Sequence, residues 1–264
     1  MKCLTRPRPR ARWVSAGLGL LLAAAAAQAQ LVVPAGATIV QPGITDLACT
    51  DALIDGTLDL AGGQLINVRH VVIGGGGAIL LGIGSITLAG NWSNSGTLNA
   101  GTGSVAFVDD AACAGSSLIS GNTSFNNLSI TSASGKLYQF SARSVQTVAG
   151  ALTLSGVAGT PLRIESTTPG SLSADINLLA GGSQSLANLA VRGMTASGQW
   201  LAPGQANQGA GPVRRWFGSP DAGLSAIPTT SQWALLVMAL ALAALGGRAR
   251  RHKSPETPRD SKDL

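Results

Sequence analysis

Ser85-Ile86-Thr87-Leu88-Ala89-Gly90 is a short stretch in which polar and apolar side chains alternate and a glycine ends the run. The same pattern returns 66 residues later as Ala151-Leu152-Thr153-Leu154-Ser155-Gly156. Alternation with a period of two is typical of β-strands that bury one of their two faces. A strand pattern that recurs along the chain indicates an architecture built from repeated units.

Further alternating stretches place strand centres near residues 87, 107, 129, 153 and 177, a step of about 20 to 24 residues. This step suits one coil of a parallel β-solenoid, in which successive coils lie about 4.8 Å apart and their inward Leu, Val and Ile side chains stack. Residues 31–226 show no amphipathic helical pattern of useful length. The sequence therefore predicts an all-β fold, a right-handed parallel β-helix (solenoid), between an N-terminal signal helix and a C-terminal transmembrane helix.

A second repeat concerns the asparagines. Residues 124–130 are echoed by residues 185–191, and the echo includes Asn126-Asn127 and Asn188. Asparagine tolerates the left-handed turn conformation, so these residues are expected in turns or in an internal ladder of amides. An immunoglobulin-like sandwich is the alternative fold. It is disfavoured because tight hairpin signals are nearly absent, Asp55-Gly56 being the exception.

The two ends of the chain read as targeting segments. Residues 1–29 combine a basic start, an apolar middle and the small-residue exit Ala27-Gln28-Ala29, which together predict a secretory signal peptide cut by signal peptidase after Ala29. Residues 30–218 form the predicted exported solenoid, closed at its end by Trp216 and Phe217. Residues 219–226 are a Gly/Pro/Ser linker.

Residues 227–253 have three parts: Ile227-Pro228-Thr229 with Trp233, an apolar run to Leu245, and a basic cluster. The run is shorter than the roughly 20 residues of a comfortable membrane-spanning helix, but bilayer thinning and snorkelling arginines accommodate short spans. The basic cluster predicts a membrane stop and a cytoplasmic tail at residues 254–264. It consists of Arg248, Arg250, Arg251 and Lys253.

This layout resembles the IPTL-CTERM sorting signal of Gram-negative bacteria. Ile227, Pro228, Thr229 and Trp233 match its pattern, whereas Thr230 and Ala234 stand where the family has Leu and Gly. The resemblance implies that an exosortase-type membrane peptidase recognises and cuts the chain. An ordinary tail anchor is the alternative. The exported part also resembles repetitive β-helical surface proteins, through residues 90–96, 101–107 and 124–128.

The charge of +6 comes from the targeting segments. Of the 18 basic residues, five lie in the predicted signal peptide and six after the apolar helix, which leaves seven in the exported part. Three of the 12 acidic residues lie in the tail, so nine remain and the exported part carries −2. Nucleic-acid binding needs a clustered basic surface, and we expect no nucleic acid as a partner.

Cys49 and Cys113 remain after the signal peptide leaves, in a compartment where disulfides persist. Their separation of 64 residues equals about three coils, or roughly 14 Å along the axis, whereas a bridge needs Cα atoms within about 7 Å. The sequence therefore leaves the disulfide open. A bridge requires one cysteine to lie in a loop or in an N-terminal cap that folds over the side of the solenoid, and the segment 109–115 could be such a loop.

No catalytic constellation emerges from the exported part. Asp109-Asp110 is the single adjacent acid pair, and neighbouring strand residues point to opposite sides. His70 is alone, and we expect it on a coil surface. Gly74-Gly75-Gly76-Gly77 lacks the Gly-Lys-Ser/Thr of a phosphate loop and is expected to be a turn. We expect no enzyme, metal or cofactor.

The sequence thus predicts an exported structural or adhesive surface protein that is first anchored in the inner membrane and later reaches the cell surface or medium. Ladders of Ser, Thr, Asn and Gln would contact surface polysaccharide. Two alternatives remain open: a polysaccharide-degrading enzyme on the same scaffold, and an uncleaved membrane-anchored periplasmic protein.

Overall fold

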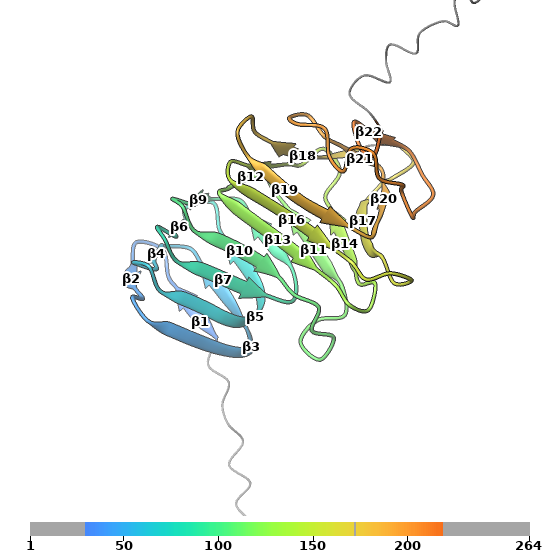
Figure 1. Cartoon of the computed structure of the whole chain (residues 1–264). Coiled ribbons are helices and arrows are strands. Elements are labelled where there is room, and N and C mark those ends of the chain that lie inside the picture. The colour runs from blue at the N-terminus through green and yellow to red at the C-terminus, as the bar shows by residue number, and fades with distance from the viewer. Residues whose placement is uncertain (1–29, 172, 219–264) are drawn as a thin grey trace, which may run out of the picture.

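Short parallel strands stacked along one axis form the computed structural model of the chain (Figure 1). The structure describes residues 30–171 and 173–218. These residues form a parallel β-solenoid of about nine coils, which confirms the predicted all-β solenoid; its right-handed sense stays a prediction. In this part of the chain no helix is long and apolar enough to cross a membrane. The predicted signal and transmembrane helices lie outside the described residues.

Each coil contributes strands to three columns, which we call the first, second and third face. The first face contains the N-terminal halves of β3 (Ile44–Ile54) and β5 (Gln64–Ile73), then β7 (Ser85–Leu88), β10 (Ser104–Phe107), β13 (Asn127–Thr131), β16 (Ala151–Ser155) and β19 (Ser183–Ala187). The second face contains β1 (Leu31–Val33), the C-terminal halves of β3 and β5, then β8 (Trp92–Asn94), β11 (Ser117–Ser120), β14 (Leu137–Phe140), β17 (Leu162–Ser166) and β20 (Leu189–Arg192).

The third face is divided into two sheets. The first holds β2 (Thr38–Val40), β4 (Thr57–Asp59), β6 (Ala78–Leu80) and β9 (Thr97–Asn99). The second holds β12 (Thr123–Phe125), β15 (Val145–Val148), β18 (Ala174–Leu178), β21 (Met194–Thr195) and β22 (Val213–Arg214). The ladder is interrupted between β9 and β12, whereas the first face runs without a break from β3 to β19.

Stacked inward side chains hold the coils together. In the longest row of the first face, each residue pairs with its equivalent one coil away, and every member is buried: Val68, Leu88, Phe107, Ile130, Leu154 and Leu186. Burying a large apolar side chain contributes about 1.5 to 3 kcal/mol. Leu88 and Leu154 belong to the two matching sequence stretches, so the repeat read from the sequence is a true structural repeat.

Two details of the predicted repeat are wrong. The strand centre near residue 177 lies in β18 on the third face, because Leu152 pairs with Gln184, an offset of 32 residues, and the next first-face strand is β19. Extra residues in the turns of this coil lengthen it. The echo of residues 124–130 in residues 185–191 is also not a structural repeat. Asn126 links the third face to the first, whereas Asn188 links the first to the second.

The expected turns and cap are present. Asn188 has φ of 50°, so it adopts the predicted left-handed turn conformation. Gly74 and Gly77 close the turn between β5 and β6 through a backbone hydrogen bond of 2.9 Å from Gly77 N to Gly74 O. At the C-terminal end, Trp216 and Phe217 are buried with ring centroids 5.8 Å apart, and Trp216 forms a β-bridge with Leu201. These aromatic residues close the last coil.

The stacked core gives a direct test of the fold. Ile130→Ala removes a buried member of the longest row and should lower the free energy of unfolding by about 2 to 5 kcal/mol. Ser129→Ala changes the neighbouring outward residue and should alter it by no more than about 0.5 kcal/mol. Urea unfolding of the two variants measures the difference. Equal destabilisation would show that this strand does not present Ile130 to the core.

Candidate functional site

The outward side chains of the first face form rows along the solenoid axis. The central row consists of Thr87, Ala106, Ser129, Thr153 and Ser185, each paired with the next. Beside it runs a row of Gln64, Ser85, Ser104 and Asn127. Members of a row lie about 4.8 Å apart, because that is the spacing of paired strands. Figure 1 shows these strands side by side over most of the length of the molecule.

Charge is absent from this stretch of the first face. Its described strand residues are 64–67, 85–88, 104–107, 127–131, 151–155 and 183–187, and none of them is Asp, Glu, Lys, Arg or His. Apart from Ile66, the outward positions are hydroxyls, amides and alanines that are half-buried or exposed. Hydroxyl and amide groups both donate and accept hydrogen bonds. From β5 to β19 the first face is therefore a regular, neutral array of donors and acceptors, whereas its first strand, β3, carries Asp46.

Asn127 fixes the edge of this array. Its Nδ2 donates to the carbonyl oxygens of Thr102 and Gly103 in the preceding coil, at 3.1 and 3.3 Å. Its Oδ1 accepts from the backbone N of Ala151 in the following coil, at 2.9 Å. One side chain thus joins three coils and satisfies backbone groups where the third face turns into the first. This is the bridging role expected of an amide ladder, carried by one residue.

The acid pair serves two different turns. Asp109 Oδ2 accepts hydrogen bonds from Ser132 Oγ at 2.8 Å and from the backbone N of Ser134 at 2.8 Å, which holds the turn of the next coil. Asp110 Oδ1 accepts from the backbone N of Ala112 in its own loop at 3.0 Å. Burial raises the pKa of Asp109, but the hydrogen bonds from Ser134, Ser132 and Ala133 together hold it below its usual value. The two carboxylates are engaged in holding these turns.

His70 lies at the corner between the first and second faces, half-buried, and not simply on a coil surface as expected. Its Nδ1 accepts a hydrogen bond of 2.8 Å from the backbone N of Asn91 in the next coil. Burial lowers the pKa of His70, and the nearby Asp51 carboxylate opposes this shift. At this corner the neutral ring therefore accepts the hydrogen bond from Asn91 N that a backbone carbonyl would accept in a regular strand pair.

Lys136 is the buried charge that the sequence analysis did not single out. It is 5 % exposed, its Nζ donates to the carbonyl oxygens of Ala89 and Val108, and the nitrogen lies 5.2 Å from the centre of the Tyr138 ring. Burial lowers its pKa, and the carboxylates of Asp109 and Asp110 oppose this. The sequence does contain a signal for this burial. Lys136 precedes the inward Tyr138 and Phe140 at the same two-residue spacing, so its side chain is expected on the same side of the strand.

Cys49 and Cys113 form a disulfide with their Cα atoms 5.4 Å apart. Cys49 has φ of 63° and lies where the register of β3 shifts. Cys113 lies in the connection between β10 and β11, which folds back along the same corner to reach it. The Asp110 carboxylate lies near the two sulfurs, within 4.8 Å. These three groups could in principle hold a metal ion, but the two sulfurs are already bonded to each other in the disulfide.

The predicted sorting residues Ile227, Pro228, Thr229 and Trp233 and the basic stop lie outside the described residues, as do Ala27 and Ala29. Comparison with protein-family models matches residues 225–252 to the IPTL-CTERM motif. The match covers the predicted sorting signal except Lys253 and implies an exported precursor whose C-terminus is processed by an exosortase-type membrane enzyme. No curated protein and no solved structure matches the chain.

The disulfide should contribute strongly to stability because it closes a loop of 64 residues. Cys113→Ser should lower the free energy of unfolding by about 4 kcal/mol, through the greater entropy of the open unfolded chain. Denaturant unfolding with and without dithiothreitol measures this. Reduction should destabilise the unaltered protein and leave Cys113→Ser unchanged; an effect of equal size on both would contradict the assignment.

Proposed function

We propose that this protein is an exported structural or adhesive component of the cell surface that contacts polysaccharide through its first face. The observation that carries the proposal is the neutral array of hydroxyl and amide groups, aligned in rows over successive coils. A polysaccharide also presents neutral hydroxyl groups at repeated intervals. The two surfaces are therefore complementary in hydrogen bonding and in the absence of charge.

Regular repetition gives such a face its strength. A single hydrogen bond between neutral groups contributes only about 0.5 to 1.5 kcal/mol after water has been displaced. Many equivalent contacts along one chain raise the effective concentration of each further contact, so weak contacts add up to useful avidity. The continuous first face offers this repetition, whereas the third face is interrupted between β9 and β12.

The structural use of the acids supports contact over catalysis. Asp59 accepts a hydrogen bond from the backbone N of Ala61 in its own turn, and Asp51 pairs with Arg69 at 2.8 Å. Asp175 accepts from Ser197 one coil away. Polysaccharide hydrolysis uses two carboxylates on opposite sides of one bond. A polysaccharide-degrading enzyme on this scaffold is therefore the weaker candidate.

The IPTL-CTERM motif supports the proposed route to the surface. In this proposal signal peptidase removes residues 1–29, and the apolar segment holds the precursor in the inner membrane. The exosortase-type peptidase then cuts near the motif, which releases the solenoid to the cell surface or the medium. An anchored periplasmic protein would instead keep its C-terminal end.

Polysaccharide binding tests the first face. Thr153→Arg places a long charged side chain in the central row and should weaken binding to polysaccharide from the surface of the producing cells by at least about tenfold, as expected for loss of several contacts. Thr147→Arg makes the same change on the third face and should leave binding unchanged. Binding is measured with immobilised polysaccharide. New reducing ends in the polysaccharide would favour the enzyme instead.

Processing is tested at the C-terminus. Mass spectrometry of the mature protein should show an end within or before residues 225–252, the matched motif. Pro228→Ala should leave full-length chains that end at Leu264 and accumulate in the inner membrane. An unaltered protein that retains Leu264 would contradict processing and favour the anchored periplasmic protein.

A further inference from the structure

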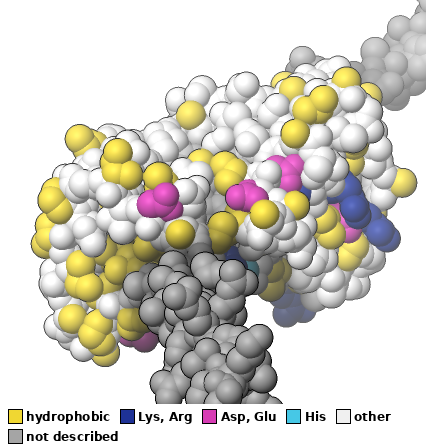
Figure 2. All heavy atoms as spheres, turned by 90° about the horizontal axis from the view of Figure 1, so that it is seen from below, with side chains coloured by type: hydrophobic (Ala, Val, Ile, Leu, Met, Phe, Trp, Pro, Cys, Tyr) yellow, Lys and Arg dark blue, Asp and Glu magenta, His cyan; other side chains and the backbone are white. Residues whose placement is uncertain are grey.

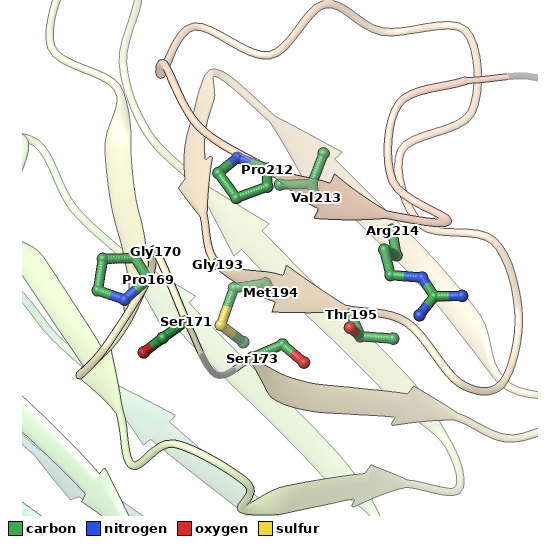
Figure 3. Close-up of a pocket in the computed structure, with 10 residues that line it drawn as sticks. All are labelled: Pro169, Gly170, Ser171, Ser173, Gly193, Met194, Thr195, Pro212, Val213 and Arg214. Carbon is green, nitrogen blue, oxygen red and sulfur yellow. The ribbon is translucent and has the colours of Figure 1, made fainter.

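A cavity of about 240 Å³ lies near the C-terminal end of the solenoid, outside the first face. Figure 3 shows its lining residues, which come from the turn before β18, from β21 and from β22. Its walls are of two kinds. Pro169 and Pro212 give accessible apolar surface, and Met194 and Val213 pack inward against the core, whereas Ser173, Thr195 and Arg214 bring hydroxyl groups and one guanidinium.

Arg214 is a cation whose guanidinium donors are available to a ligand. Within residues 30–171 and 173–218 its guanidinium forms no hydrogen bond and no ion pair. The neighbouring Arg215 differs, because its guanidinium donates to the carbonyl oxygens of Ser197 and Gly198. Arg214 pairs in register with Thr195, so their outward side chains are neighbours at the cavity. A guanidinium beside a hydroxyl is a suitable pair of donors for a carboxylate.

Two more arginines lie around the cavity. Arg192 directly precedes the lining residue Gly193, and its side chain carbons lie so close to Gly211 that a methyl group there would clash. The backbone N of Arg143 donates to the carbonyl oxygen of the lining residue Ser173 at 2.8 Å. In the described part of the chain, neither guanidinium has a hydrogen-bond or ion-pair partner of its own. Asp175 pairs in register with Thr195 on the side opposite Arg214, and its carboxylate accepts hydrogen bonds from Ser197.

These arginines belong to a charge gradient along the solenoid. Residues 30–136 contain six Asp and Glu against two Lys and Arg, whereas residues 137–171 and 173–218 contain two against five. Basic side chains lie in the right-hand part of Figure 2, as seen from below. The C-terminal coils therefore carry a net positive charge, although the exported part as a whole is slightly acidic, and this charge favours an anionic ligand.

We infer that this cavity binds one acidic sugar residue of a polysaccharide, with the sugar carboxylate held by Arg214 and Thr195. The inference rests on the proposed contact with surface polysaccharide and names a second, charge-selective site for it. The cavity is smaller than the roughly 300 to 1,000 Å³ of sites for drug-sized ligands, which suits a single sugar ring. The accessible rings of Pro169 and Pro212 suit the C–H faces of such a sugar ring, whereas a free phosphate would leave them unused.

Binding of trigalacturonate to the full chain in detergent solution tests the inference, with its methyl-esterified form as the matched neutral ligand. Titration calorimetry should show binding of the acid and at least about tenfold weaker binding of the ester. Arg214→Gln should weaken binding of the acid by about tenfold to a hundredfold, the usual effect of losing a charge-assisted contact. Thr195→Val should weaken it less.

Arg163→Gln is the control, because it removes one positive charge from β17, where Arg163 pairs with Glu165 at 3.5 Å. It should change binding less than about twofold, as an exposed pair contributes little. Thermal unfolding of each variant checks that the fold is retained. Equal weakening by Arg163→Gln and Arg214→Gln, equal binding of the ester, or equally tight binding of inorganic phosphate or of phosphatidylglycerol vesicles would overturn the inference.

The test of the cavity can be distinguished from the test of polysaccharide binding by the first face. Thr153→Arg lies outside the cavity and should not alter trigalacturonate binding. If trigalacturonate fails to bind while neutral polysaccharide still binds through the first face, the cavity assignment alone is wrong. If only trigalacturonate binds, the neutral contact face is wrong and the cavity stands.

Discussion

Register between successive coils is the constraint on which the structure depends. Each inward side chain must lie over its equivalent one coil away, as Leu88 lies over Phe107 and Phe107 over Ile130. A slip of one residue would turn these side chains outward and bring Thr87 or Ser129 into the core. The same register that stacks the core also aligns the outward hydroxyls. The same strand pairing therefore fixes both the packing of the core and the alignment of the first face.

Variation in coil length is confined to the corners. Between the first and second faces the connection is nine residues from Val108 to Ser116, but only Asn188 between β19 and β20. The polar and charged groups with special roles gather at this corner, among them His70, Lys136 and the disulfide. Backbone groups that lose their ladder partners in a turn need other partners. The corner residues supply them, and the strands of the first face remain regular.

The distribution of charge separates two kinds of surface. From β5 to β19 the first face is neutral, whereas in residues 30–171 and 173–218 the arginines whose guanidinium has no hydrogen-bond or ion-pair partner, Arg143, Arg192 and Arg214, lie in the C-terminal coils. We propose that the neutral array contacts repeated hydroxyl groups and that the cavity with Arg214 binds a carboxylate. If both proposals hold, the ligand is a polysaccharide that contains both neutral and acidic sugars. The acids, by contrast, are largely engaged in turns and in ion pairs.

Local pattern determined the fold class, because alternation and a coil step follow directly from residues such as Ile86, Leu88, Leu152 and Leu154. The sorting motif could also be read directly, since a membrane peptidase recognises it as a linear stretch. The turn lengths could not be read in this way. They decided that residue 177 belongs to the third face and that Cys113 reaches Cys49.

The candidate sites divide in the same way. The hydroxyl rows could be predicted from the polar positions of each strand. The burial of Lys136 could also be predicted, because it is two residues before the inward Tyr138 in an alternating strand. The cavity was not, because Ser173, Thr195 and Arg214 come from three successive coils. Sequence alone determined which residues alternate, because alternation is local. Tertiary structure decided which residues meet across coils, because that depends on the length of every turn between them.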